Sequence, residues 1–322
     1  MISKDTFKNI KILVIGDVML DHYIKGTVTR LSPEAPVPVV HKSIDEYYLG
    51  GAGNVFSNVI SLGAKCDILS VIGDDFSGTY VSHLIETKSQ NRGVLLQNSN
   101  RKTTTKVRVI GNSHQIVRID DEDASEISSD IQKDLIERFD SIVENYDGVI
   151  LEDYNKGILV PNLIEHVISS CRLKNIPVLV DPKMKYIESY KGCTIFKPNL
   201  SEFSFISGVN FSPDLLDLHT ELYSFKEKMN IDLMIVTLSE RGIIYGKGSE
   251  TKLIEGFPVN VSDVSGAGDS VSAMLLLSYI SGIPTDSIAR LCNIAGSIAC
   301  SKIGAVSVQI EEVLENSHIK EV

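Results

Sequence analysis

Short apolar runs without polar alternation recur along the chain, separated by stretches of helical periodicity. The strand candidates are KILVIGD (11–17), DILSVIGDD (67–75), GVILED (148–153), PVLVDPK (177–183), CTIFKPN (193–199) and DLMIVTLS (232–239). Uninterrupted apolar runs are typical of parallel strands that are buried on both faces. The pattern therefore predicts an α/β fold, a doubly wound sheet with helices on both faces. In such a sheet, ligands bind beyond the C-terminal ends of the strands.

Two segments interrupt this alternation. Residues 21–49 and 93–120 contain short β-rich runs with no helical pattern between them. Together they predict a small β-sheet that protrudes from the main sheet and acts as a lid. Because both segments are insertions and no long linker occurs, residues 1–322 are expected to form a single domain.

Composition excludes several classes of protein. The net charge of −11 argues against a surface for nucleic acid or an anionic membrane. The five cysteines include no CxxC pair, which favours free thiols in a reducing compartment. The polar start, MISKDTFKNI, is unlike a signal peptide, and no apolar stretch is long enough to cross a membrane. These features predict a cytoplasmic protein.

Two glycine-rich stretches could bind phosphate. GGAGN (50–54) leads into a helical pattern, but it lacks the last glycine of the dinucleotide-binding fingerprint GxGxxG. The Walker pattern GxxxxGK[ST] is absent from the sequence. A dehydrogenase and a P-loop enzyme are therefore both disfavoured. GGAGN taken alone is compatible with a simple turn or with a binding loop.

DVSGAGDS (263–270) is more specific, because its glycine loop runs directly into an apolar helical segment that we expect to begin at Ser270. Amides at the start of a helix lack intrahelical partners and carry the positive end of its dipole. Asp269 could merely cap this helix. The second carboxylate, Asp263, and the apolar helix behind the loop favour a site that handles phosphate.

In this order, GGAGN, NLSE (199–202) and DVSGAGD are similar to the motifs of the ribokinase, or PfkB, family of sugar kinases. The similarity extends over essentially the whole chain and implies a ribokinase-like fold. GDVMLDHYIKGTVTRLSPEAPVPVV (16–40) further resembles the start of bacterial kinases for D-glycero-β-D-manno-heptose 7-phosphate. Those enzymes phosphorylate the C1 hydroxyl to give the 1,7-bisphosphate, on the route to ADP-heptose for surface polysaccharide.

Many kinases of that subfamily are fused to a nucleotidyltransferase. The resemblance here stops near GAVSVQIEEVLE (304–315), which implies a stand-alone kinase. The alternatives are a kinase of the same family for ribose, fructose or a phosphosugar, or a sensor that binds a nucleotide or sugar phosphate without catalysis. The resemblance also implies a homodimer formed through the lid.

The resemblance implies ATP and Mg²⁺ as cofactors and assigns roles at the late motifs. Asp269 is the expected catalytic base, and the amides of Gly266, Ala267 and Gly268 are expected to stabilise the transferring phosphoryl group. Asn199 and Glu202 are expected to act on Mg²⁺ through water. Asn199 could instead cap the following helix. The expected ATP-binding residues are Asn199, Glu202, Ser239, Glu240, Gly242, Asp263 and Asn293.

The small-molecule substrate is assigned to the early motifs. Asp17, Asp21, Gly50, Gly51 and Asn54 match positions that bind sugar hydroxyls in the family, although either aspartate could be a loop cap. The 7-phosphate of the sugar requires cations. The candidates are Lys156, Lys183, Arg108 and Arg118, any of which could be ordinary surface charge. Lys183 is favoured because it follows the end of a strand.

Overall fold

The computed structural model describes residues 2–89, 94–112, 114–211 and 216–317. Its main sheet has the strand order β13-β12-β11-β10-β9-β8-β1-β4-β5. The strands from β11 to β5 in this order pair in parallel, whereas β12 and β13 are antiparallel. The bounds are β1 Lys11–Gly16, β4 Lys65–Gly73, β5 Val94–Asn98, β8 Gly148–Glu152, β9 Val178–Asp181, β10 Ile195–Phe196, β11 Leu233–Thr237, β12 Ile243–Lys247 and β13 Glu250–Ile254. All of the predicted parallel strands are present.

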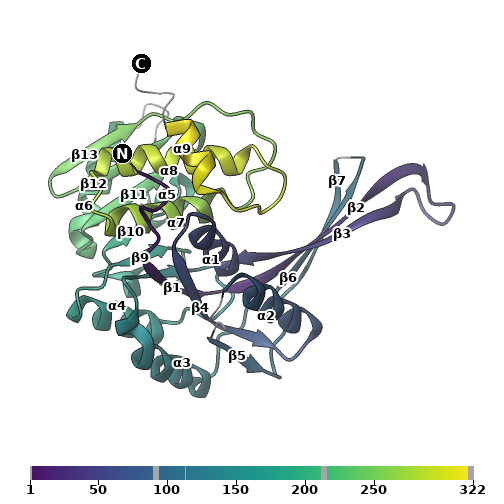
Figure 1. Cartoon of the computed structure of the whole chain (residues 1–322), viewed down its shortest axis with the longest axis horizontal. Helices are drawn as coiled ribbons and strands as arrows, with labels where there is room; N and C mark the ends of the chain where they lie inside the picture. The colour runs from purple at the N-terminus through teal and green to yellow at the C-terminus, as the bar shows by residue number, and fades with distance from the viewer. Residues whose placement is uncertain (1, 90–93, 113, 212–215, 318–322) are drawn as a thin grey trace.

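Helices cover both faces of this sheet (Figure 1). Side chains of β1 alternate between two hydrophobic cores: Ile12 and Val14 pack in one, Leu13 and Ile15 in the other. Helices α1, α2, α7, α8 and α9 contribute to the first core, and α3, α4, α5 and α6 to the second. The bounds are α1 Ala52–Ser61, α2 Phe76–Lys88, α3 Ser129–Ile142, α4 Pro161–Leu173, α5 Leu200–Ser207, α6 Leu216–Met229, α7 Ala267–Ile280, α8 Thr285–Cys300 and α9 Ile310–Ser317. Burial on both faces explains the continuous apolar runs in the sequence.

A second sheet protrudes from the main body and forms the predicted lid (Figure 1). Its strand order is β3-β2-β6-β7, with bounds β2 Val18–Leu31, β3 Pro38–Gly51, β6 Thr105–Gly111 and β7 His114–Asp121. The predicted segment 21–49 was too short, because β2 and β3 are long strands rooted in the main body. The prediction for 93–120 was partly wrong. Residues 94–98 form β5, which pairs with β4 of the main sheet, so the lid strands begin at Thr105. Residues 93 and 113 lie outside the described ranges.

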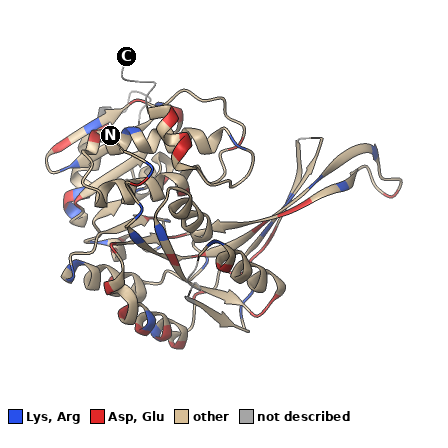
Figure 2. Cartoon of the chain, viewed as in Figure 1, with Lys and Arg blue, Asp and Glu red and all other residues tan. Residues whose placement is uncertain are grey.

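Acidic and basic residues both occur on the outer helices, such as α3, and along the lid strands (Figure 2). In the part of the chain that the structure describes, no helix is both long and apolar enough to span a bilayer.

Candidate active site

A cavity of about 700 Å³ opens where β8, β9, β10 and β11 end and α7 begins. This is the C-terminal edge of the parallel strands, where an open α/β sheet binds its ligands. Of the residues predicted from sequence, the cavity is lined by Lys183, Asn199, Glu202, Ser239, Glu240, Gly242, Gly266, Ala267, Gly268, Asp269 and Asn293. The structure therefore brings the expected catalytic and nucleotide-binding residues together, with the exception of Asp263.

Asp269 lies in the first turn of α7 and is almost completely buried. Its Oδ2 accepts a hydrogen bond from the Asn54 amide at 2.6 Å, and its Oδ1 accepts one from the Tyr154 hydroxyl at 2.9 Å. Burial, with a smaller contribution from the negative charge of Asp181, raises the pKa of Asp269 to about 6. A carboxyl with this pKa is mostly ionised at neutral pH and can still accept a proton there.

The start of α7 has the geometry of an anion site. The helix begins at Ala267, not at Ser270 as predicted, because Gly266 adopts a left-handed conformation (φ 76°) as its N-cap. A Cβ atom on Gly266 would lie 2.4 Å from Nδ2 of Asn54, so a side chain would displace that residue. The amides of Gly268 and Asp269 belong to the first turn, which has no intrahelical acceptors for them. The Ala267 amide makes a long contact of 3.4 Å with the carbonyl of Val264.

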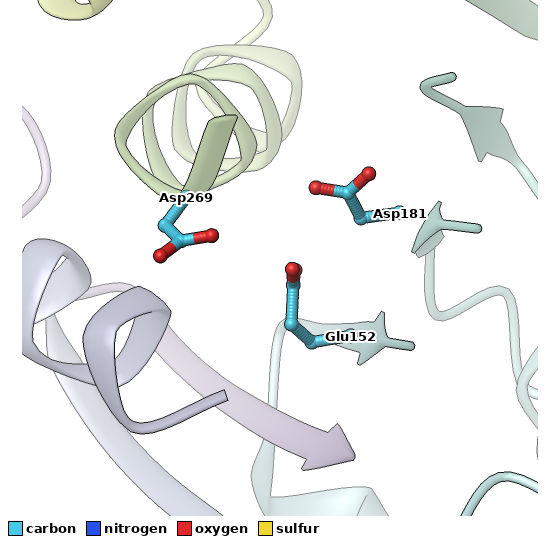
Figure 3. A group of neighbouring side chains, drawn as sticks. All are labelled: Glu152, Asp181 and Asp269. Carbon is cyan, nitrogen blue, oxygen red and sulfur yellow. The ribbon is translucent and has the colours of Figure 1, made fainter. Parts of the chain in front are cut away.

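A cluster of buried carboxylates lies beside this helix. Glu152, Asp181 and Asp269 each offer an oxygen within 4.8 Å of the others (Figure 3). Oε2 of Glu152 is buried and has no hydrogen-bond partner among the described residues. Burial, together with repulsion from Asp181 and Asp269, raises the pKa of Glu152 well above its usual value. A cation bound among these carboxyls would therefore stabilise their ionised forms.

Lys197 supplies one cation to this cluster. Its side chain is 3% exposed, and its ammonium nitrogen lies 2.7 Å from Oδ2 of Asp181. Burial alone would lower the pKa of Lys197, but attraction to Asp181 and Glu152 raises it above the usual value. Sequence analysis missed Glu152, Asp181 and Lys197 as site residues. The available signal was that each ends, or directly follows, a buried parallel strand.

The donor set fits a divalent cation. Mg²⁺ prefers oxygen ligands and is usually held by one or two carboxylates plus substrate phosphates. Glu152 and Asp181 offer carboxylate oxygens, and the unpartnered oxygen of Glu152 lies within the cluster. Among the described residues, the cluster and the neighbouring Glu202 provide four acidic side chains, whereas two lysines, Lys197 and Lys183, lie beside them. A bound Mg²⁺ would therefore offset charge that the protein leaves uncompensated.

Asn199 and Glu202 form a capping box at the start of α5. The Asn199 side chain accepts from the Glu202 amide at 2.8 Å, and the Glu202 carboxylate accepts from the Asn199 amide at 2.9 Å. The helix-capping alternative for Asn199 is thus present in the structure, on the wall of the cavity. The other carboxylate oxygen of Glu202 pairs with Lys183. Lys183 therefore lies at the end of the cavity where Glu202 and Asp181 are, and not at the lid.

The residues predicted to bind the sugar lie at the root of the lid. The buried carboxylate of Asp17 accepts from the amides of Tyr154, Lys156 and Ile158, as the loop-cap alternative requires. Burial and the nearby Asp153 raise the pKa of Asp17 to about 6. Asp21 is buried and pairs with Arg108.

Close packing at the lid root explains both predicted glycines. A Cβ on Gly50 would lie 2.6 Å from Oδ2 of Asp21. One on Gly51, whose φ is 57°, would lie 2.4 Å from the carbonyl oxygen of Asp17. The Asn54 side chain donates its amide hydrogen bond to Asp269 and does not point into open space.

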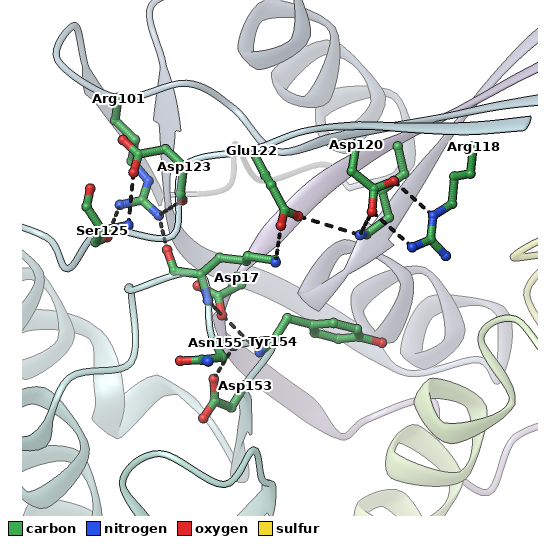
Figure 4. Close-up of polar contacts among 12 residues, drawn as sticks. Asp17, Arg101, Arg118, Asp120, Glu122, Asp123, Ser125, Asp153, Tyr154 and Asn155 are labelled. Atoms are coloured by element: carbon green, nitrogen blue, oxygen red, sulfur yellow. Dashed lines mark hydrogen bonds and ion pairs between the residues drawn. The ribbon is translucent and has the colours of Figure 1, made fainter.

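Each candidate cation for the remote phosphate has an acidic partner. Arg108 pairs with Asp21, Lys156 with Glu122 at 2.7 Å, and the exposed Arg118 with Asp120 at 2.9 Å. Lys106, which was not predicted, lies between Asp120 (3.3 Å) and Glu122 (3.7 Å). Apart from the Arg108–Asp21 pair, these groups form a chain of alternating charge from the lid to the loop around Asp17 and Tyr154, in which Figure 4 labels Arg118, Asp120 and Glu122.

Besides Asn199 and Glu202, two more of the predicted nucleotide-binding residues make contacts within the fold. The Asn293 amide donates to the carbonyls of Ile254 (3.2 Å) and Glu255 (2.9 Å) from the cavity wall. Asp263 does not line the cavity. Its carboxylate accepts from the amides of Ser265 and Gly304, both at 3.0 Å, and so fixes the loop before α7. Sequence analysis missed the apolar wall formed by Phe257, Pro258, Val259 and Val261.

A helix N-terminus, a buried carboxylate and an acidic cluster at one sheet edge define an α/β enzyme that handles phosphate groups. The pfkB family carbohydrate kinases match residues 9–312. The chain therefore belongs to the pfkB family, whose members are ATP-dependent sugar kinases.

Among curated proteins, the chain is 36% identical over 309 residues to the bifunctional protein HldE of Campylobacter curvus. It is 39% identical over 307 residues to the bifunctional protein HldE of a Nitratiruptor species. These alignments cover 96% and 95% of this chain, but only 65% and 64% of those proteins. The chain thus spans less than two thirds of the length of these relatives.

Solved structures share the fold. Phosphofructokinase-2 from Escherichia coli in complex with potassium superposes with a TM-score of 0.78 at 18% identity, over 96% of this chain and 98% of that one. Arabidopsis thaliana ribokinase complexed with ribose and ATP gives a TM-score of 0.70 at 17% identity, over 94% and 97%. The ribokinase-like fold that the motifs implied is confirmed.

Proposed function

We propose that this protein phosphorylates the C1 hydroxyl of D-glycero-β-D-manno-heptose 7-phosphate with ATP to give the 1,7-bisphosphate. Asp269 carries the proposal: a buried carboxylate on a helix N-terminus faces a cavity that contains cations and an acidic cluster. The choice of sugar is supported by the motifs and by HldE relatives that match nearly the whole chain.

The chemistry of transfer follows from this geometry. Asp269 accepts the proton of the C1 hydroxyl while the hydroxyl oxygen of the sugar forms a bond to the γ-phosphorus of ATP. The bond from that phosphorus to the bridging oxygen breaks, and ADP leaves. Amides of Ala267 and Gly268 at the start of α7 stabilise negative charge on the transferring group. Mg²⁺, when bound, neutralises phosphate charge; Glu152 and Asp181 would hold it, with Asn199 and Glu202 acting through water.

The nucleotide fits the remaining walls of the cavity. The apolar loop containing Phe257 and Val261 faces α8, and offers a surface for the adenine ring. We assign Lys183 to the nucleotide phosphates and not to the sugar phosphate, because it lies beside Glu202 and Asp181. Ser239, Glu240 and Gly242 border the same space.

The class of substrate is tested with Mg²⁺–ATP and a panel of sugars and sugar phosphates. We expect ADP release to be fastest with the heptose 7-phosphate, and NMR of the product to show a new phosphate on C1. Faster turnover of ribose or fructose would identify another sugar kinase of the family. No ADP release with any acceptor would favour the non-catalytic sensor.

We assign the remote phosphate of the sugar to Lys106 and Lys156, whose ammonium groups both contact Glu122. A phosphate dianion can replace that carboxylate as their acceptor. Lys106→Met and Lys156→Met should each raise KM for the sugar phosphate by about tenfold, with a smaller change in kcat, because the phosphate is remote from the chemistry. Steady-state kinetics against heptose and its 7-phosphate measure this.

Lys102→Met provides a matched control, since Lys102 is exposed and pairs with Asp121 near the same strands. It should leave KM unchanged. If the Lys106 and Lys156 variants lost the same factor in kcat/KM with heptose as with its 7-phosphate, the assignment would be contradicted.

We also propose that the lid forms a homodimer. Apolar residues alternate along β6 and β7 with the charged residues Lys106, Arg108, Arg118 and Asp120. Because alternate residues of a strand point to opposite faces, one face of the lid is apolar and carries Val107, Val109, Val117 and Ile119. Val117 and Ile119 are exposed. In sedimentation experiments the parent should be a dimer, and a Val117→Lys/Ile119→Lys variant should be a folded monomer. A dimeric double variant would refute the lid as the interface.

A further inference from the structure

In the part of the chain that the structure describes, the Tyr154 hydroxyl is one of two side-chain donors that hold the Asp269 carboxylate. Tyr154 donates to Oδ1 at 2.9 Å, and the Asn54 amide donates to Oδ2 at 2.6 Å. One donor on each oxygen opposes rotation of the carboxylate about its Cβ–Cγ bond. The two donors reach Asp269 from different parts of the fold, since Asn54 is on α1 and Tyr154 follows β8.

The loop that presents Tyr154 is held by Asp17. The buried Asp17 carboxylate accepts from the amides of Tyr154 (2.9 Å), Lys156 (3.0 Å) and Ile158 (3.2 Å) (Figure 4). Hydrogen bonds to a buried charged acceptor are among the stronger ones in proteins. The backbone that carries the Tyr154 ring is therefore fixed relative to the end of β1.

Contacts from the other side fix the same loop. The nearly buried Arg101 donates to the carbonyl oxygens of Lys156, Ser125 (2.9 Å) and Asp123 (3.0 Å). Gly157 has φ 85°, and a Cβ there would lie 2.0 Å from the carbonyl oxygen of Ser125. This close approach requires glycine. The loop thus has one conformation defined from both sides, and that conformation directs Tyr154 to Asp269.

We infer that Tyr154 is a positioning residue for phosphoryl transfer: its hydroxyl fixes the orientation of the Asp269 carboxylate towards the acceptor hydroxyl. This rests on the role of Asp269 as base in the proposed function. It does not depend on which sugar is the acceptor. Proton transfer requires hydrogen-bond geometry between base and hydroxyl, so a carboxylate that can rotate spends less time in the productive orientation.

The first test is Tyr154→Phe, which removes the hydroxyl and keeps the ring. We expect kcat to fall about tenfold, the scale of one hydrogen bond to a charged group. KM for ATP and for the sugar should stay within about twofold, because neither ligand loses a contact. A folded variant, judged by its melting temperature, that retains kcat within about twofold of the parent would overturn the inference.

The second test is a double-variant cycle with Asp269→Asn. If Tyr154 acts only through Asp269, adding Tyr154→Phe to Asp269→Asn should change kcat by less than about twofold. A further tenfold loss in that background would show that Tyr154 acts elsewhere, and would overturn the inference. This comparison remains valid even if Tyr154→Phe lowers stability, because both backgrounds carry the same change.

Tyr146→Phe is the matched control. Tyr146 is also buried and also donates to a carboxylate, Oδ2 of Asp67 at 2.8 Å, but at the opposite end of the strands. It should leave kcat unchanged. A tenfold fall in this control would attribute the Tyr154 effect to general loss of structure and would overturn the inference.

The tests separate this inference from the proposed function. If heptose 7-phosphate is not a substrate but another sugar is, the choice of sugar fails and Tyr154 is tested with that sugar. If no sugar is phosphorylated, the proposed function fails. The parent and the Tyr154→Phe variant are then compared by ATP hydrolysis, in which Asp269 would accept a proton from the attacking water. An equal rate in both would overturn the inference.

Discussion

Asp269→Asn should lower kcat by about 10²–10⁴, the range typical of losing a general base. Asparagine is nearly isosteric with aspartate. With its carbonyl oxygen accepting from the Asn54 amide, its NH2 group can donate to the Tyr154 hydroxyl, so both contacts are kept. The variant should therefore fold and bind ATP about as well as the parent. Turnover, ATP affinity and melting temperature, measured together, check the expectation. The structure already excludes the capping alternative for Asp269, because Gly266 is the N-cap of α7 and no side chain caps this helix. Near-normal kcat in a folded variant would reduce Asp269 to a structural partner of Asn54 and Tyr154, and Asp21 would be the next candidate for the base.

The pH dependence of the parent gives an independent check. Burial raises the pKa of Asp269 to about 6, and a base must be deprotonated to act. The kcat/KM of the parent, which reports the pKa of the free enzyme, should therefore be constant well above that pH and fall as the pH decreases through about 6. The Asp269→Asn variant should lack this acidic limb. If the variant kept an acidic limb with the same midpoint, the fall in rate at low pH would belong to another titrating group.

Lys197→Met should lower the free energy of unfolding by about 3–5 kcal/mol at pH 8, because it leaves buried charge without its partner. Lys197 is 3% exposed and pairs with Asp181 in the acidic cluster. Chemical denaturation measures the loss. Without the ammonium group, the pKa of Glu152, which attraction to Lys197 lowers, should rise further. The loss should therefore shrink as the pH is lowered to 5.5, where the carboxyls take up protons in the folded state.

Lys228→Met is the control for this experiment, because Lys228 is exposed and its pair with Glu188 lies on the surface. Its effect on unfolding should be slight at either pH. A loss below about 1 kcal/mol for Lys197→Met at pH 8, or one that grows as the pH falls, would contradict the role assigned to Lys197.

The parallel strands could be predicted because burial on both faces leaves an uninterrupted apolar signal. That signal fails at the sheet edges. β5 has the sequence VLLQN and resembles a lid strand, so only its pairing with β4 places it in the main sheet. The hairpin β12–β13 was missed, although Gly248 and Ser249 between its strands are a turn signal.

The site was predictable where a motif is contiguous, as in DVSGAGDS. It was not predictable where the site is assembled from separate strands. Glu152, Asp181 and Lys197 are each an ordinary charged residue in sequence, and their proximity depends on the order β8, β9, β10 in the sheet. Lys183 shows the other limit: its place after a strand could be read from sequence, but the direction of its side chain towards Glu202 could not.

The lid is joined to the main body without a flexible connection. Only Asp17 separates β1 from β2, and β3 runs directly into α1. The Ala52 amide donates to the Asp17 carbonyl at 3.0 Å, so the two strand roots are tied to each other. The long hairpin is therefore anchored in the main body between Asp17 and Asn54. The roots of this hairpin carry Asp17 and Asn54, the two residues that contact Tyr154 and Asp269, so a displacement of the hairpin relative to the main body would move both contacts. We therefore expect a binder or a cross-link at residues 32–37, the turn between β2 and β3, to change kcat without entering the cavity.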